Sequence, residues 1–285
     1  MEERESNKRG INLLDLPDGC LSHILSLTSP FYVLRSSLVC KFFHSIAKSD
    51  LVWEKFLPSD FHPIIQHSSA SPSKKHIVLH LCRSFILLED GHKSFSLDKW
   101  TGKKCYMLGA RELTLAFSDN SRCWRWKPLP ESRFPEVAEL LGVAELHITG
   151  RISTQLLSPN TTYHMYFSFM LGAWSRGFEV SPVKVFVSRI ATNGAYLGGS
   201  SSYDTSKSFY LKAPENDEMF DDVEGEEAFE HRRDSGHRWI KIDMGKYFNR
   251  VDDNVAALEM TLMGTEVSLH KSGLIIHGIE ILPLD

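Results

Sequence analysis

Apolar residues recur at helical spacing from residue 13 to 57, which reads LLDLPDGCLSHILSLTSPFYVLRSSLVCKFFHSIAKSDLVWEKFL. Leu16 and Pro17 begin the first predicted helix, where proline is tolerated because the N–H it lacks would have no intrahelical acceptor. Pro30 is expected to end this helix. Its apolar positions lie one and three residues apart: Cys20, Leu21, Ile24 and Leu25.

Two further helices are predicted in the same segment. The second carries the apolar residues Leu34, Leu38, Val39, Phe42, Phe43 and Ile46. The third is short and carries Leu51, Trp53 and Phe56. These positions cover more than one narrow stripe per helix, and a unit of this size cannot bury all of them internally. The surplus indicates a partner, such as a groove between helices of another protein.

After Gly91 the apolar pattern changes to a period of two, which is typical of half-buried strands. The alternating sets are Tyr163, Met165, Phe167, Phe169 and Leu171; Val183, Val185 and Val187; Ile240 and Ile242; Leu258, Met260 and Leu262; and Ile279 and Ile281. Turn residues separate the sets at Ser158-Pro159-Asn160, Asn193-Gly194, Gly198-Gly199 and Lys271-Ser272-Gly273. Many short strands, with one brief helical candidate at 134–141, predict an antiparallel β-sandwich.

The segments between these two patterns predict the domain organisation. Residues 58–73 contain three prolines and five serines and are expected to be a linker. A helical stripe over 74–88 predicts a helix that docks the two halves. Nine acidic residues in 215–230 predict a solvated loop rather than a calcium site, because the spacing does not match an EF-hand loop. The predicted divisions are a disordered leader at 1–10, a helical module at 11–57, a linker with docking helix at 58–91 and a β-sandwich at 92–285.

Composition narrows the class of protein. A hydrophobic content of 42% and a charged content of 24% describe a globular protein, and the net charge of −4 argues against a nucleic-acid-binding surface spread over the chain. No apolar run is long enough for a membrane helix, so no membrane partner is expected. The five cysteines show no CxxC spacing, which favours reduced thiols in the cytoplasm, the nucleus or both.

The helical segment resembles an F-box, the adaptor-binding module of Skp–cullin–F-box ubiquitin ligases. The matching residues, in order, are Leu-Pro at 16–17, Ile24-Leu25, Ser-Leu-Val-Cys-Lys at 37–41, Phe43 and Leu-Val-Trp at 51–53. The resemblance implies that a Skp-type adaptor, and through it a cullin, binds Leu16, Pro17, Ile24, Leu38 and Val39. The alternative is that these side chains only pack against one another. The apolar triplet Phe31-Tyr32-Val33 stands where such modules often carry a charged turn.

Three later stretches resemble the phloem lectin (phloem protein two) family of plants. They are FSLDKWTGKKCYMLGARELTLAF at 95–117, CWRWKPLPESRFPEVAELLGVAELHITGRI at 123–152, and RWIKIDMGKYFN at 238–249 with GLIIHGIEILP at 273–283. The resemblance implies a jelly-roll-like sandwich and, in lectin members, binding of glycans that contain N-acetylglucosamine. An F-box followed by this domain is the arrangement of the plant F-box phloem-lectin-like proteins.

A sugar site needs an aromatic side chain over the apolar face of the ring and polar groups at its rim. The resemblance implies that Trp124 stacks on the sugar, with Trp126 and Phe117 as further candidates. A core position is equally open for Trp124 and is favoured for Trp126. Lectin relatives often have tryptophan where Phe117 and His270 stand and glutamate where Gly264 stands, and these departures predict weak sugar binding at best.

No catalytic or metal motif appears in the sequence. His76 and His80 are four residues apart without a third ligand nearby, so a structural role is favoured and no cofactor is expected. The leading hypothesis is a non-catalytic substrate receptor of a Skp–cullin–F-box ligase whose sandwich captures a target, possibly glycosylated. Two alternatives stay open: a sandwich that binds protein and no sugar, and a nucleocytoplasmic lectin acting outside degradation.

Overall fold

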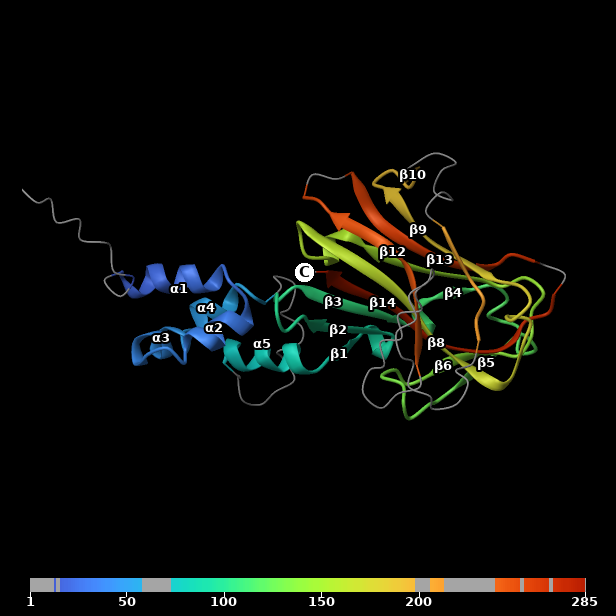
Figure 1. The fold of residues 1–285 in the computed structure, drawn as a ribbon, viewed down its shortest axis with the longest axis horizontal. Coiled ribbons are helices and arrows are strands. Elements are labelled where there is room, and N and C mark those ends of the chain that lie inside the picture. The colour runs from blue at the N-terminus through green and yellow to red at the C-terminus, as the bar shows by residue number, and fades with distance from the viewer. Residues whose placement is uncertain are drawn as a thin grey trace, which may run out of the picture. The chain divides into compact units, whose positions relative to one another are not determined.

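The computed structural model describes residues 13, 16–57, 73–197, 206–212, 239–251, 254–266 and 269–284. The chain divides into two compact units (Figure 1). The first comprises residues up to Ser84 together with 97–102, and the second comprises 85–96 and the chain from Lys103 onward. The predicted leader, most of the predicted linker and the acidic run at 215–230 lie outside the described residues.

The first unit is helical. Its helices are α1 (Asp18–Ser26), α2 (Pro30–Ser36), α3 (Lys41–Ile46), α4 (Asp50–Glu54) and α5 (Lys74–Arg83). Pro30, expected to end the first helix, instead begins the second. The Ser29 hydroxyl oxygen accepts the N–H of Tyr32 at 3.4 Å, and proline at the first helical position leaves no N–H unpaired.

The single helix predicted from Leu34 to Ile46 is two helices. Cys40 is extended, with φ −158° and ψ 167°, and it separates α2 from α3. Before it, the N–H groups of Ser37, Leu38 and Val39 donate to carbonyls of α2, so this turn satisfies its own backbone. The apolar spacing continues through the break, which is why periodicity alone did not reveal it.

Four fully buried side chains form the centre of the first unit: Leu21, Val33, Val52 and Trp53. Burial of each contributes about 1.5–3 kcal/mol. The Trp53 indole N–H donates to the Ala47 carbonyl at 2.8 Å, which satisfies the one polar atom of that side chain. Residues 97–102 complete the unit, and the Trp100 ring lies edge-on to the Phe31 ring with centroids 4.6 Å apart. This contact gives the unusual apolar residue Phe31 a partner.

The helix predicted over 74–88 ends at Arg83 and belongs to the first unit. Its first N–H, from Lys74, donates to the Asp50 carboxylate at 3.1 Å, and the Lys74 ammonium lies 2.8 Å from the Glu54 carboxylate. Ser84 is extended, and the apolar residues that follow form a strand instead of another helical turn. The second unit therefore begins at residue 85 rather than at the predicted 92.

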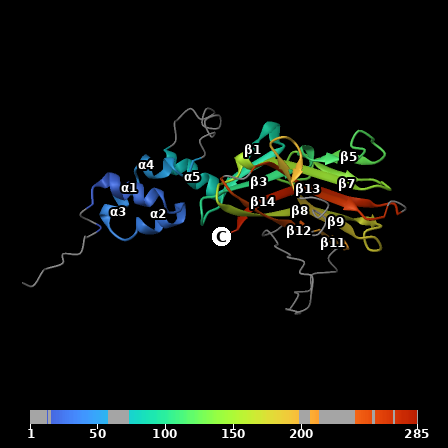
Figure 2. The same ribbon diagram turned by 90° about the horizontal axis from the view of Figure 1, so that it is seen from above.

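The second unit is an antiparallel β-sandwich, as predicted, and Figure 2 shows its strands from above. One sheet contains β1 (Ile86–Leu88), β2 (Lys93–Leu97), β3 (Lys104–Gly109), β5 (Trp124–Lys127), β6 (Val137–Leu140), β8 (Thr161–Arg176), β12 (Ile240–Asn249) and β14 (Ser272–Leu284). The other contains β4 (Thr114–Leu115), β7 (His147–Ser153), β9 (Val183–Ala191), β10 (Tyr196–Leu197), β11 (Lys207–Phe209) and β13 (Val255–Gly264).

The alternating residues form the core between the sheets. Side chains exposed by 1% or less include Tyr163, Met165, Phe167, Phe169, Leu258, Met260, Leu262, Ile279 and Ile281. Two local predictions are wrong. The segment predicted to be helical at 134–141 contains strand β6, which pairs with β5 and β14. The turn predicted at Lys271-Ser272-Gly273 is instead the start of β14, preceded by a bridge between Lys271 and Val143.

Candidate interaction surfaces

The first unit leaves several large apolar side chains in solvent. Of the five predicted adaptor-binding residues, Leu38 is 84% exposed, Val39 71% and Ile24 41%. Pro17 is exposed as well, and Leu16 is half-buried. The exposed apolar residues of this unit that were not among those predicted include Leu13, Leu27 and Leu51.

Leu38 and Val39 are held outward by the turn that separates α2 from α3. The N–H of Leu38 donates to Arg35 at 3.2 Å and that of Val39 to Ser36 at 3.0 Å. The Ser37 hydroxyl adds a bond to the Leu34 carbonyl at 2.6 Å. The backbone of this turn is hydrogen-bonded internally, so it needs no partner. The two apolar side chains remain exposed to water, and a partner surface would bury them. Among the described residues, this is the site that best fits a docking function.

Leu27 extends the same exposed set along α1. It lies three residues after Ile24, so both side chains are on one side of the helix end. The Ile24/Leu27 spacing is visible in the sequence and could have identified Leu27. The sequence gives no such signal for Leu51. Its neighbours Val52 and Trp53 are equally apolar but fully buried, and only the folded structure shows that Leu51 is the exposed one.

Trp124 lies in the core, which is one of the two roles that the sequence left open for it. Its side chain is 3% exposed, and its indole N–H donates to the Ala116 carbonyl at 2.8 Å. The residue pairs with Leu140 on β6, which is also buried. An indole in this position has no face open to a sugar ring.

Trp126 is half-buried and has one face covered. The guanidinium carbon of Arg111 lies 3.7 Å from the ring centroid. Arg111 also donates two hydrogen bonds to one carboxylate oxygen of Glu136, at 2.9 and 2.6 Å. This paired, stacked guanidinium closes one face of the Trp126 ring to a sugar.

Phe117 is the sugar candidate whose ring is open to solvent. It is 54% exposed, and its φ of 62° lies in the left-handed region that disfavours side chains larger than glycine. The turn is held by the N–H of Asn120, which donates to the Phe117 carbonyl at 3.0 Å. Backbone strain of this kind is concentrated at functional sites, so Phe117 keeps its predicted candidacy.

The buried side chain of Lys271 lies close to Gly264, the position where lectin relatives often have glutamate. A Cβ added to Gly264 would lie 3.4 Å from the Lys271 Nζ. The ammonium, fully buried, donates instead to the Ser181 hydroxyl at 3.1 Å and to the Glu266 carbonyl at 3.3 Å. Burial lowers the pKa of Lys271. A glutamate at position 264 would therefore lie close to the buried ammonium of Lys271, and glycine supplies no such carboxylate. His270, next to Lys271 in the chain, is exposed.

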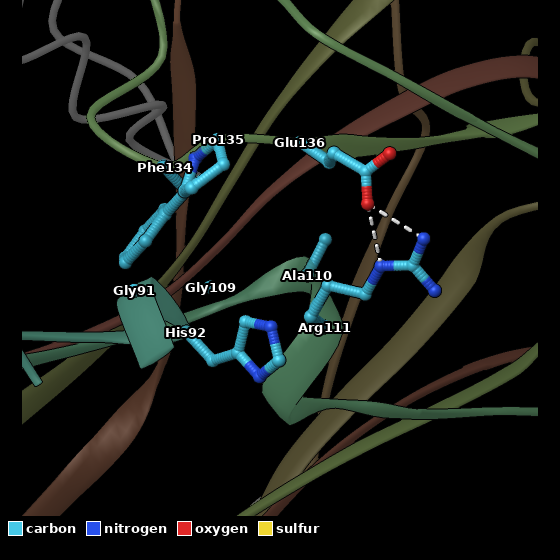
Figure 3. Close-up of a pocket in the computed structure, with 8 residues that line it drawn as sticks. All are labelled: Gly91, His92, Gly109, Ala110, Arg111, Phe134, Pro135 and Glu136. Carbon is cyan, nitrogen blue, oxygen red and sulfur yellow. Dashed lines mark hydrogen bonds and ion pairs between the residues drawn. The ribbon is translucent and has the colours of Figure 1, made fainter. Parts of the chain in front are cut away.

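A shallow cavity in the second unit is too small for a typical ligand. Figure 3 shows its lining by Gly91, His92, Gly109, Ala110, Arg111, Phe134, Pro135 and Glu136. Its volume is about 20 Å³, whereas ligand pockets measure roughly 300–1,000 Å³. Arg111 and Glu136 neutralise each other on one wall. This cavity does not have the character of an active site.

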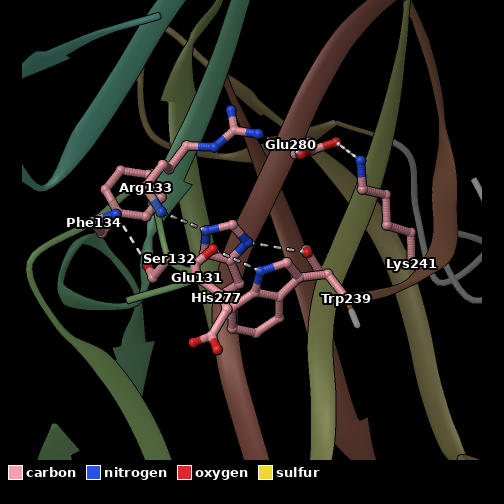
Figure 4. A network of polar contacts seen from close by, with 9 residues as sticks. Glu131, Ser132, Arg133, Phe134, Trp239, Lys241, His277 and Glu280 are labelled. Carbon is pink, nitrogen blue, oxygen red and sulfur yellow. Dashed lines mark hydrogen bonds and ion pairs between the residues drawn. The ribbon is translucent and has the colours of Figure 1, made fainter. Parts of the chain in front are cut away.

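A buried polar network fastens a long loop to the first sheet (Figure 4). The Glu280 carboxylate, 3% exposed, lies 2.8 Å from the Lys241 ammonium and 3.3 Å from the Arg133 guanidinium. The Trp239 ring stacks on His277 with centroids 4.1 Å apart, and its N–H donates to the Glu131 carbonyl at 3.2 Å. Each charged group is paired, so the network is structural.

The described residues contain no group of three or more possible metal ligands, and no described helix is long and apolar enough to cross a membrane. Burial raises the pKa of the Cys82 thiol to about 11, which leaves it a poor nucleophile. Burial also acts to raise the pKa of Asp243, but hydrogen bonds and charges from His164 and Lys207 outweigh it and bring the pKa to about 2. None of the five cysteines, all of which the structure describes, forms a disulfide.

Two domain families match the chain in the order expected. Residues 13–55 match the F-box domain, and residues 103–283 match phloem protein 2. These ranges correspond to the helical module with its exposed apolar residues and to most of the sandwich.

Several plant proteins resemble the chain over nearly its whole length. It is 36% identical to putative F-box protein PP2-B12 of Arabidopsis thaliana, covering 96% of this chain and 98% of that protein. It is 36% identical to F-box protein PP2-B1 of the same plant (94% and 89%) and 33% identical to F-box protein VBF (95% and 99%). Among solved structures, the CBM22-1 xylan-binding domain of Paenibacillus barcinonensis Xyn10C aligns with a TM-score of 0.32 at 14% identity, covering 62% and 88%. That similarity is too low to bear on function.

Proposed function

The chain belongs to the F-box proteins that carry a phloem protein 2 domain, and we propose that it is the substrate-receptor subunit of a Skp–cullin–F-box ubiquitin ligase. F-box proteins are in general receptor subunits that bind a Skp-type adaptor. The observation that carries the proposal is the exposed pair Leu38 and Val39, presented by a turn whose backbone is already hydrogen-bonded. Such a pair would be a costly feature in a module without a partner.

The proposed role needs no catalytic group in this chain. Holding a target beside a charged conjugating enzyme raises the effective concentration of the reacting lysine, while the chemistry takes place on other subunits.

We further propose that the sandwich recognises its target through protein contacts rather than through a strong glycan site. Two of the three predicted aromatic platforms are covered, one by the core and one by Arg111. Phe117 is a smaller platform without an N–H donor, and Gly264 supplies no carboxylate to a sugar hydroxyl. Among the three predicted platforms, Phe117 is the one that could add a sugar contact to recognition of a glycoprotein target.

For localisation we propose the cytoplasm, the nucleus or both. None of the five cysteines forms a disulfide, which supports a reducing compartment, because secreted proteins of this size usually oxidise their thiols in pairs.

The proposal is tested by assembly of the full chain with a purified plant Skp-type adaptor and a cullin. Size-exclusion chromatography should show one complex containing all three proteins. Leu38→Ser with Val39→Ser should remove this chain from the complex and leave the adaptor–cullin pair intact. An unchanged ternary complex with this variant would contradict the proposal.

A further inference from the structure

Strand β8 carries a wide bulge where it runs beside β14. In their antiparallel register Leu171 pairs with Leu274 and Arg176 with Ser272. Four residues of β8, from Gly172 to Ser175, therefore face the single residue Gly273. Bulges of this kind re-aim a side chain out of the sheet, and they are common beside functional sites.

Gly273 is required for this bulge. Its φ of 82° lies in the region that favours glycine. A Cβ at this position would lie 2.6 Å from the Cα of Ser175, a backbone atom that cannot move without moving the strand. The close approach of the two strands fixes the geometry of the bulge.

The bulge projects Trp174 into solvent. The side chain is 82% exposed, more than the other exposed tryptophan among the described residues, Trp100 at 47%. Tryptophan is among the residues that most often supply binding energy at protein interfaces. No sequence motif singled out this residue, because the alternating apolar set of β8 runs from Tyr163 to Leu171 and Trp174 lies outside it.

Arg176 follows two residues later and is also exposed. No carboxylate in the described part of the chain forms an ion pair with it. The nearest acid in sequence, Glu179, is engaged otherwise: hydrogen bonds from the N–H groups of Glu179, Gly177 and Phe178 lower the pKa of its carboxyl. The guanidinium is therefore available to a carboxylate of a partner, two residues along the strand from the exposed Trp174.

We propose that Trp174 and Arg176 bind an extended segment of the target protein in which an apolar side chain neighbours a carboxylate. The indole would cover the apolar group, and the planar guanidinium would donate two parallel hydrogen bonds to the carboxylate. An uncharged glycan would leave this cation unused, which favours an acidic peptide. The inference rests on the proposed receptor function and names the chemistry that the receptor selects.

The test is selection of a random peptide display library on the full-length protein bound to its adaptor. Enriched peptides should share an apolar residue next to Asp or Glu. Fluorescence anisotropy with a selected peptide should show that Trp174→Ala and Arg176→Gln each weaken binding by roughly tenfold or more. Val251→Ala and Arg189→Gln, which change an exposed valine and an exposed arginine elsewhere in the second unit, should leave binding unchanged.

Three results would overturn the inference: no acidic and apolar consensus, equal binding by Trp174→Ala, or equal binding by Arg176→Gln. A sugar site would be indicated instead if N-acetylglucosamine oligomers bound wild type, Trp174→Ala abolished that binding and Arg176→Gln did not. Adaptor affinity, measured on the same variants, should equal that of wild type. Failure of adaptor binding by wild type would count against the receptor function, whereas failure of peptide selection alone would count against this site.

Discussion

The indole N–H of Trp124 donates to the Ala116 carbonyl at 2.8 Å, and this bond places the side chain in the core of the sandwich. A residue expected to be a platform for sugar is thus a structural anchor of β5. Its neighbour on the same face, Trp126, is more exposed but is capped by Arg111.

Trp124→Ala should destabilise the protein by about 3–5 kcal/mol, because it removes a large buried side chain and leaves a cavity. Trp124→Phe should cost less, about 1–3 kcal/mol, since it keeps most of the packing and loses the buried hydrogen bond. Urea unfolding followed by circular dichroism measures both changes. Trp174→Ala is the matched control, and its 82% exposure predicts a change within about 0.5 kcal/mol. Equal stability of Trp124→Ala and Trp174→Ala would contradict the core assignment.

Glycan binding, if the domain retains it, should depend on Phe117 and not on Trp124. Phe117→Ala should weaken binding of N-acetylglucosamine oligomers by about tenfold, which corresponds to loss of one exposed aromatic contact of roughly 1–1.5 kcal/mol. Isothermal titration of the oligomers into wild type and Phe117→Ala measures this difference. Tyr210→Ala, which removes another exposed aromatic ring, serves as the control. Wild type that binds no oligomer would remove the lectin role altogether.

Asp243 should make the stability of the second unit depend on acid. Its pKa in the folded protein is about 2, below the ordinary value of 3.8, because His164 and Lys207 favour the carboxylate. A folded pKa below the unfolded one contributes stability above about pH 4, and this contribution is lost as the pH falls from about 4 to about 2. The shift corresponds to at most about 2.5 kcal/mol, and solvent screening reduces this to roughly 1 kcal/mol.

The measurement is urea unfolding at pH 6 and pH 3. Asp243→Asn should lower stability at pH 6 and show a smaller loss on acidification than wild type. Asp119→Asn, at an exposed site, should follow the wild-type curve. An acid dependence identical in wild type and Asp243→Asn would contradict the assignment.

Much of the fold could be predicted because the patterns are local. The alternation through Tyr163 and Phe169 predicts β8 directly, since side chains two apart share a face of the sheet. One error in the predicted secondary structure arose where contacts distant in sequence determine the conformation. The run at 134–141 is apolar enough for a helix, but its ladders with β5 and β14 make it a strand. The break at Cys40 has a local cause: the turn before it is stabilised by its own hydrogen bonds, which the continuous apolar spacing does not reveal.

The candidate sites divide along the same line. Leu38 and Val39 could be predicted because their family motif lies in one short segment, and the structure finds both exposed. Trp124 and Trp126 could not be distinguished by sequence, since their covers come from Ala116 and Arg111 on other segments. Trp174 gave no signal at all, because its exposure depends on a bulge that Gly273 permits from a strand nearly a hundred residues later.

The most direct test of the receptor assignment is the affinity of the full chain for a purified Skp-type adaptor, measured by isothermal titration. Leu38→Ser with Val39→Ser should weaken binding by roughly a hundredfold, because two exposed anchors are lost from a small interface, while circular dichroism remains that of wild type. Val251→Ser, which removes an equally exposed valine from the second unit, should bind as wild type does. Undiminished adaptor binding by the double variant, or no binding by wild type, would contradict the account.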